Sequence, residues 1–510
     1  MKPVHLLAFS ASVVLASFIA FSADNKPPGP GSGKDGQRKG GKGGKGGDVP
    51  IVDLANLFRT DVPAHSLDVV LGRPTKNSVT ARVLAYADRE GVIQFGPKAG
   101  APVAKTAVFA LKASVPVEIA ITGLQPDTQY FYRLSTRAGS GAWTTEPERS
   151  FRTQRAPGRT FTFTVQADPH LDDKVEPKLL ERSLLNSLSD APDFHIDLGD
   201  TFMTDKYRRR YELAAKQYVA QRYYFGLIGH SAPVFLTLGN HDGEMGGRRH
   251  DEDEAAWSNT MRKKYFANPI PDGFYTGDEF KHPKLGLLQD YYAWTWGDAL
   301  FVVLDPFWFS GEARDDNWAR SLGEAQYQWL KRTLEGSRAK FKFVFLHHLV
   351  GGATPEGRGG SEAAPFYEWG GKNEDGTDGF AAHRPGWPMP IHQILVQHHV
   401  SIVFHGHDHI FAKQDLDGIV YQEVPQPGNP DKGGRDGIPR TAAEYGYLSG
   451  KILGSPGYMR ITVAPENVTA DLVRSYLPVS KSDGRKNHEV AYSYTISASE
   501  KSVPARGPGE

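Results

Sequence analysis

Five short clusters of potential metal ligands lie between residues 168 and 409. They are Asp168-Pro169-His170, Gly199-Asp200, Gly239-Asn240-His241-Asp242, His347-His348 and Gly406-His407-Asp408-His409. Carboxylate and amide oxygens together with imidazole nitrogens suit Mn, Fe or Zn, and one shared carboxylate can hold two such ions close together. The chain contains no cysteine, which excludes thiolate ligands, disulfides and a cysteine nucleophile. Any metal must therefore be bound by His, Asp, Glu or Asn.

Each cluster taken alone is a weak signal, because a single buried histidine is more often a hydrogen-bonded core residue than a ligand. The set gains meaning from its position, since every cluster follows a strand-like run of apolar, β-branched or aromatic residues. These runs are 161–166, 194–198, 234–238, 341–346 and 400–404. Ligands of α/β sheets bind outside the carboxyl ends of the strands, so five loops are expected to converge at one edge.

The segments around these runs predict the remaining elements. Residues 176–188 and 324–334 have helical periodicity, and 291–296 with 299–304, joined by Gly297-Asp298, predict a β-hairpin. Further strands are expected at 459–463 and 469–473. The pattern predicts an α/β (α+β) domain over residues 158–498, with two β-sheets flanked by helices.

Ahead of this domain, residues 51–154 have an all-β pattern. Short alternating runs occur at 78–84, 91–95, 116–121, 130–134 and 149–153, separated by turn residues. The stretch from Leu124 to Arg133 resembles the tyrosine corner of fibronectin type III domains, in which a Tyr hydroxyl is tied to upstream backbone. We expect a fibronectin-III-like β-sandwich that contributes no ligand.

The two ends of the chain predict export and flexible extensions. Lys2, the apolar stretch 6–20 and the small residues near Ser22 indicate a signal peptide over residues 1–22. An uncleaved membrane anchor is the alternative, because the apolar stretch is nearly long enough to span a bilayer. Residues 23–50 form a Gly-, Lys- and Pro-rich linker, and 499–510 a disordered tail. A periplasmic or secreted protein is therefore expected.

The ordered clusters resemble the signature of the calcineurin-like metallophosphoesterase superfamily, namely Asp-x-His, Gly-Asp, Gly-Asn-His-Asp, His and Gly-His-x-His. The resemblance covers 161–410 and implies a metallophosphoesterase sandwich with two divalent or trivalent ions. It assigns one ion to Asp168, His170, Asp200 and His409, and the other to Asp200, Asn240, His347 and His407. His347 is taken as the ligand because the first histidine of such a pair usually binds in this family; His348 is the alternative. His241 is implied to be the catalytic imidazole that touches the substrate phosphate.

The fibronectin-like domain ahead of the catalytic one resembles the layout of purple acid phosphatases. This chain departs from their metal site, since Met203 stands where their metal-binding tyrosine is expected and their first motif lacks an equivalent of His170. The domain order is also similar to that of the alkaline phosphatase/phosphodiesterase D group, whose cysteine ligand is absent here. The colour and ferric site of purple acid phosphatases are therefore not expected.

A dinuclear centre of this kind lowers the pKa of a bound water to roughly 7, and the resulting metal-bound hydroxide attacks phosphorus. In the long Gly-rich stretch 350–380 and just after it, Arg358, Trp369 and Arg384 are candidate substrate contacts. The expected substrate is a small phosphate ester; a phosphodiesterase or nucleotide hydrolase is the alternative to a monoesterase. An inactive binding or adhesion protein is a further alternative, but it would be expected to lose ligands.

The composition indicates no macromolecular partner. Lys+Arg and Asp+Glu balance at 59 each, so no nucleic-acid partner is expected. No later segment predicts a membrane partner, and the oligomeric state stays open.

Overall fold

The computed structural model describes residues 58–246, 252–311, 317–352, 354, 356–430, 439–478 and 485–498. The predicted signal peptide, linker and C-terminal tail lie outside these residues. Within the described ranges, none of the helices is both long and apolar enough to cross a membrane.

The N-terminal part of the described chain is a β-sandwich of two antiparallel sheets. One sheet has the order β1-β2-β6 and the other β4-β3-β7-β8, with β5 beside β3 and β9 beside β7. The strands are β1 (Leu67–Gly72), β2 (Ser78–Ala85), β3 (Arg89–Gly96), β4 (Ala104–Lys105), β5 (Phe109–Leu111), β6 (Val117–Thr122), β7 (Gln129–Arg137), β8 (Thr144–Thr145) and β9 (Arg149–Arg152). The Tyr130 hydroxyl accepts the N–H of Gln125 at 2.9 Å, which is the upstream tie that a tyrosine corner predicts.

Two further sheets pack face to face in the C-terminal part. The first has the order β12-β11-β10-β23-β24-β25, and the second β13-β16-β17-β18-β19-β21-β20-β22. The strands of the first are β10 (Phe161–Gln166), β11 (Phe194–Asp197), β12 (Val234–Leu236), β23 (Gly457–Val463), β24 (Asn467–Arg474) and β25 (Val490–Ser497). Those of the second are β13 (Thr276–Gly277), β16 (Tyr292–Trp296), β17 (Ala299–Val303), β18 (Phe341–Phe345), β19 (Ile402–His405), β20 (Phe411–Leu416), β21 (Ile419–Glu423) and β22 (Lys451–Leu453). A small hairpin joins β14 (Lys281–His282) to β15 (Gly286–Leu287).

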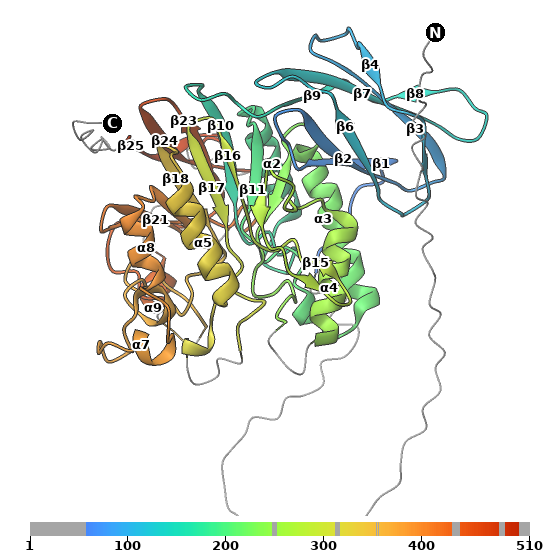
Figure 1. Ribbon diagram of the computed structural model, residues 1–510. Coiled ribbons are helices and arrows are strands. Elements are labelled where there is room, and N and C mark those ends of the chain that lie inside the picture. Colours follow the sequence, from blue (N-terminus) through green and yellow to red (C-terminus); the bar gives the residue numbers. More distant parts are fainter. Residues whose placement is uncertain are drawn as a thin grey trace, which may run out of the picture. The chain divides into compact units, whose positions relative to one another are not determined.

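Aromatic and aliphatic side chains fill the space between the two sheets, and helices cover their outer faces. The shared core contains Phe163 and Phe194 from one sheet and Phe301, Phe343 and Phe404 from the other. Figure 1 shows α5 and α8 outside the sheet of β17 and β18, with α3 and α4 on the opposite side. The helices are α2 (Pro177–Ser189), α3 (Tyr211–Gly229), α4 (Glu252–Tyr265), α5 (Glu324–Gly336), α6 (Tyr367–Gly370), α7 (Phe380–His383), α8 (Ile391–Gln397) and α9 (Arg440–Glu444), with 3₁₀ turns η1 (Thr204–Tyr207) and η2 (Asn317–Ala319). The predicted architecture of two sheets flanked by helices is confirmed.

Parallel pairing explains why the ligand clusters meet. Strands β10, β11 and β12 pair in parallel, and so do β17, β18, β19 and β21. Their carboxyl ends therefore lie at common edges of the two facing sheets, where the loops after β10, β11, β12, β18 and β19 carry all five clusters.

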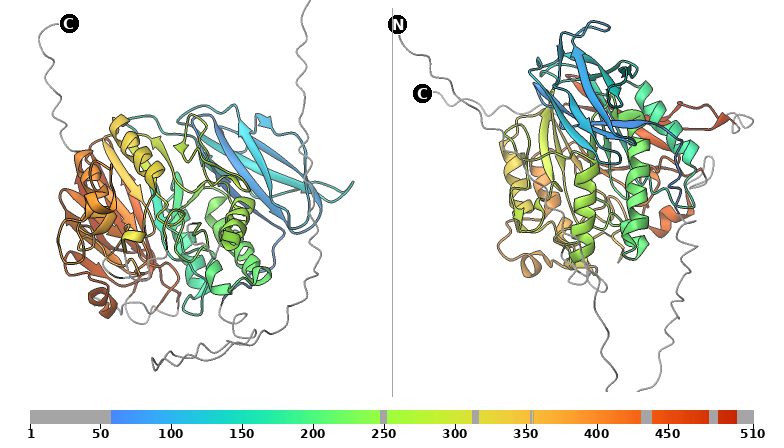
Figure 2. Two further views of the ribbon diagram at one scale, coloured as in Figure 1. Left: turned by 60° about the horizontal axis from the view of Figure 1, so that its bottom comes forward. Right: turned by 90° about the vertical axis from the view of Figure 1, so that its right-hand side faces the viewer.

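The sandwich shares a core with the C-terminal part, as Figure 2 illustrates with the blue strands beside the green helices. Val70 of β1 and Leu84 of β2 pack with Tyr218 and Phe225 of α3. Arg222 of α3 is fully buried between the two parts. Its guanidinium donates to the carbonyls of Asp68 (3.3 Å) and Arg82 (2.8 Å) in the sandwich and of Tyr265 (3.0 Å) in α4.

We expect Arg222→Met to lower the free energy of unfolding by ~1–3 kcal/mol, because it leaves buried carbonyls without a donor. Urea unfolding followed by circular dichroism measures the change. Lys216→Met on the exposed side of the same helix is the control and should be near neutral. Equal stability of the two variants would show that the three carbonyls gain nothing from Arg222.

Candidate metal centre

The predicted ligands stand on strained turns directly after the strands. Five of them have a positive φ, namely Asp168 (60°), His170 (25°), Asp200 (55°), His407 (78°) and His409 (59°). Left-handed backbone at a residue other than glycine costs of order 1–3 kcal/mol, and such residues cluster at active and ligand-binding sites. At these five positions the backbone turns at the sheet edge, and the ligand side chain points toward the other clusters.

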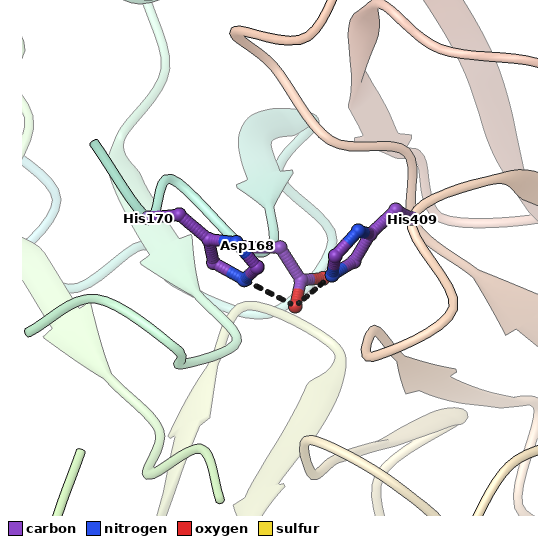
Figure 3. Close-up of side chains that lie close together, drawn as sticks. All are labelled: Asp168, His170 and His409. Atoms are coloured by element: carbon purple, nitrogen blue, oxygen red, sulfur yellow. Dashed lines mark ion pairs between the residues drawn. The ribbon is translucent and has the colours of Figure 1, made fainter. Parts of the chain in front are cut away.

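Asp168, His170 and His409 form one group of donors, drawn in Figure 3. The Asp168 Oδ1 atom lies 3.4 Å from His170 Nε2 and 3.3 Å from His409 Nε2. Asp168 and His170 are buried, whereas His409 keeps 17% of its side-chain surface exposed. The group therefore opens to solvent on the side of His409.

Asp200, His347 and His407 form a second group, and all three are buried. His347 Nε2 lies 3.2 Å from Asp200 Oδ2, 3.2 Å from His407 Nδ1 and 3.0 Å from Asn240 Oδ1. Four predicted ligands from four different loops thus converge around one point.

Asp200 connects the two groups. Its Oδ2 atom is 3.2 Å from His347 of the second group and 3.6 Å from His170 of the first. Its Oδ1 atom accepts the backbone N–H of His241 at 2.8 Å, which fixes the rotation of the carboxylate. This is the geometry expected of a carboxylate shared by two ions.

The donor atoms fit metal ions in two ways. Asp168 Oδ1 and His170 Nε2 are buried without a hydrogen-bond partner, which is costly unless a ligand satisfies them. In addition, His347 and His407 each have one ring nitrogen hydrogen-bonded away from the site. His347 Nδ1 donates to the Leu198 carbonyl at 2.9 Å, and His407 Nε2 donates to the Glu356 carbonyl at 3.1 Å. Each of these two rings therefore keeps one lone pair turned into the site, as a neutral imidazole ligand requires.

The electrostatics of the site favour positive charge. Burial opposes ionisation of Asp168, but His409 and His170 outweigh it and hold the pKa of this carboxyl well below its ordinary value. For Asp200, His347 and His241 likewise outweigh burial, so its pKa is also well below the ordinary value. Burial alone would lower the pKa of His347, yet Asp200 and Asp168 raise it to about 9. Ionised carboxylates thus create a site that a cation can neutralise.

Asp242 organises the loop that carries Asp200. Its carboxylate accepts four backbone N–H groups, from Asp200 (3.1 Å), Thr201 (2.8 Å), Phe202 (2.7 Å) and Gly239 (2.7 Å). The loops after β11 and β12 are therefore tied to each other by one buried side chain. Gly239 approaches Asp200 so closely that a Cβ would lie 2.1 Å from its backbone nitrogen, which explains the glycine.

His241 lies at the mouth of the site and belongs to neither donor group. Its Nδ1 atom bonds Asp205 Oδ2 at 2.9 Å, and 24% of the side chain is exposed. Sequence reasoning did not single out Asp205. Asp205 lies only five residues after the predicted ligand Asp200, which is the one sequence feature that could have indicated it. That this position faces His241 depends on the short 3₁₀ turn η1.

The structure distinguishes the two neighbouring histidines. His347 faces Asp200 and Asn240, whereas His348 Nε2 lies 3.2 Å from Arg320 and its Nδ1 donates to the Leu349 carbonyl. His348 is therefore held outside both donor groups.

The three predicted substrate contacts differ in position. Arg358 lies beside the centre, where Nη1 donates to the His407 carbonyl (3.1 Å) and to Asp408 (2.9 Å). The prediction for Trp369 is wrong, because its indole is fully buried in the core and donates to the Tyr421 hydroxyl at 2.9 Å. Arg384 is engaged by the buried Glu368 and by three main-chain carbonyls, so it packs the Gly-rich segment instead of facing a substrate.

Comparisons with known proteins agree with this fold. Residues 161–411 match the family described as calcineurin-like phosphoesterase. The fold is similar to that of PhoD (17% identity, TM-score 0.59, covering 86% of this chain and 92% of that one). It is also similar to purple acid phosphatase PPD1 from yellow lupin (Lupinus luteus) seeds (14% identity, TM-score 0.57, covering 85% and 74%). No curated protein matches the chain in sequence. Residues 161–411 therefore form a domain of the calcineurin-like metallophosphoesterase superfamily, and the chain is a metal-dependent phosphoric ester hydrolase.

Proposed function

We propose that this chain is an exported phosphoesterase that binds two metal ions, one at Asp168, His170 and His409 and the other at Asn240, His347 and His407, with Asp200 shared. The observation that carries the proposal is the position of Asp200 Oδ2, within 3.6 Å of His170 and 3.2 Å of His347. When bound, two such ions activate water and neutralise charge on the phosphoryl group.

The residues of the chain divide the remaining work. Asp242 holds the Asp200 loop rigid, so the shared carboxylate needs no rearrangement during the reaction. His241 has its Nδ1 engaged by Asp205, which leaves Nε2 to donate a proton to the leaving oxygen. Asp205 orients the ring for that transfer through this hydrogen bond.

Export is proposed from the N-terminal sequence, with its basic start at Lys2, its apolar run and its small-residue cleavage site near Ser22. Mass spectrometry of the protein isolated from its native compartment measures the mature N-terminus. A product that retains Met1 would support the anchored alternative.

We expect the purified protein to contain close to two transition-metal ions, because the seven ligand side chains surround two positions. Elemental analysis after chelator-free purification measures this number, and chelation should abolish hydrolysis that Mn, Fe or Zn then restores. Parallel assays of an aryl phosphate monoester and the matching diester identify the substrate class. A metal-free protein that stays inactive after all three metals are added would refute the proposed function.

A further inference from the structure

Two residues that precede the sandwich touch the loop of the first donor group. Phe58 forms an antiparallel β-bridge with Asp172, and the Arg59 N–H donates to the Leu171 carbonyl at 2.6 Å. We refer to Phe58 and Arg59 as the N-terminal strap. It joins the segment before β1 to the turn that follows the metal ligand His170.

This turn is strained and is held from outside. His170 and Leu171 have φ values of 25° and 57°, which residues with side chains rarely adopt. The Arg59 N–H holds the Leu171 carbonyl, and the Gln217 side chain holds the His170 carbonyl at 2.5 Å. A strained turn persists only where its surroundings over-determine it, so these two donors help to keep His170 in place.

The ring of Phe58 acts on the same turn by a second route. It is 5% exposed and stacks on Tyr207 with centroids 4.5 Å apart. The Tyr207 hydroxyl donates to Gln217 Oε1 at 2.8 Å, which orients the amide whose Nε2 holds the His170 carbonyl. Tyr207 also ends η1, the turn that carries Asp205, the partner of His241.

We propose that the N-terminal strap positions the catalytic centre: through Leu171 and the Tyr207–Gln217 pair it holds His170 for the first metal and Asp205 for His241. The inference rests on the proposed dinuclear function. The strap thus positions residues of the hydrolytic centre, although neither Phe58 nor Arg59 is a ligand. Loss of the strap should weaken the metal at Asp168, His170 and His409 while the second site, built on other loops, is retained.

A matched pair at position 59 tests the backbone contact in the full-length protein. Arg59→Pro removes the N–H that Leu171 accepts, whereas Arg59→Ala keeps it and removes only an exposed side chain. Equilibrium dialysis with Mn²⁺ measures the affinity of each site. We expect Arg59→Pro to lower the affinity for one of the two ions by about 10- to 100-fold, which is the usual effect of residues that orient metal ligands. Arg59→Ala should bind both ions as tightly as wild type.

Phe58→Ala tests the ring, with Phe95→Ala as control because Phe95 is a similarly buried phenylalanine in the sandwich core. At equal loss of thermal stability, only Phe58→Ala should lose one Mn²⁺ and turnover; Phe58→Leu, which keeps more of the apolar contact, should recover part of both. If wild type binds two ions and the Phe58→Ala and Arg59→Pro variants bind both as tightly, this inference alone is overturned. Wild-type protein that binds none would overturn the proposed function instead.

Discussion

Asp200→Asn should be the most damaging single substitution among the ligands, reducing turnover by more than about 100-fold. Residues that merely orient metal ligands contribute about 10- to 100-fold, and Asp200 is proposed to bind both ions directly. The substitution keeps the shape of the side chain but removes the charge that faces His347 at 3.2 Å and His170 at 3.6 Å. Both ions should therefore be bound more weakly, which elemental analysis and kcat measured at saturating metal will show.

The control is Asp193→Asn, the same change at a buried carboxylate that bonds Arg155 and Trp296 at the opposite end of β11. It should lower stability and leave metal content and turnover intact. If Asp200→Asn retains both ions and near-normal turnover, the carboxylate is not shared.

His241→Ala should slow the hydrolysis of alkyl phosphate esters by ~10²–10⁴-fold, the usual contribution of a positioned general acid. Nitrophenyl esters should be affected much less, because nitrophenolate leaves without a proton. Metal content should stay unchanged, since His241 belongs to neither donor group. Initial rates on both ester types, with wild type in parallel, give the comparison.

Asp205→Asn probes the same function through the partner of His241. An amide can still bond Nδ1, but its hydrogen bond is weaker than that of a carboxylate and orients the ring less firmly, so this variant should show the same leaving-group dependence in weaker form. Equal losses on alkyl and nitrophenyl esters would assign His241 to charge stabilisation on the phosphoryl group. Loss of metal in His241→Ala would make it a ligand.

Strand positions were predictable because buried strands have a local signature. The runs 161–166 and 341–346 correspond to β10 (Phe161–Gln166) and β18 (Phe341–Phe345), and the predicted hairpin is the antiparallel pair β16–β17. Strands β4 and β8 were not predicted, because each has two residues and too little pattern to stand out from a loop. β1 was also missed, since its burial depends on α3, which is distant in sequence.

The roles of the Gly-rich segment could not be read from residue type. Trp369 and Arg384 are residues that often contact substrates, but an indole and a guanidinium serve equally well to fill a core and to bind carbonyls. Burial decided between these uses, and burial depends on the packing of α6 against α8 and the second sheet.

The sequence by itself determined the ligand types, their order along the chain and the strands that precede them, because these are local properties of the residues. It thereby determined the superfamily and the class of chemistry. The tertiary structure alone decided that Asp200 Oδ2 lies between His170 and His347, that Asp205 serves His241, and that the segment before the sandwich contacts the turn after His170. Each of these contacts joins residues from separate loops, so it depends on how strands pair and sheets pack, which local residue patterns do not encode.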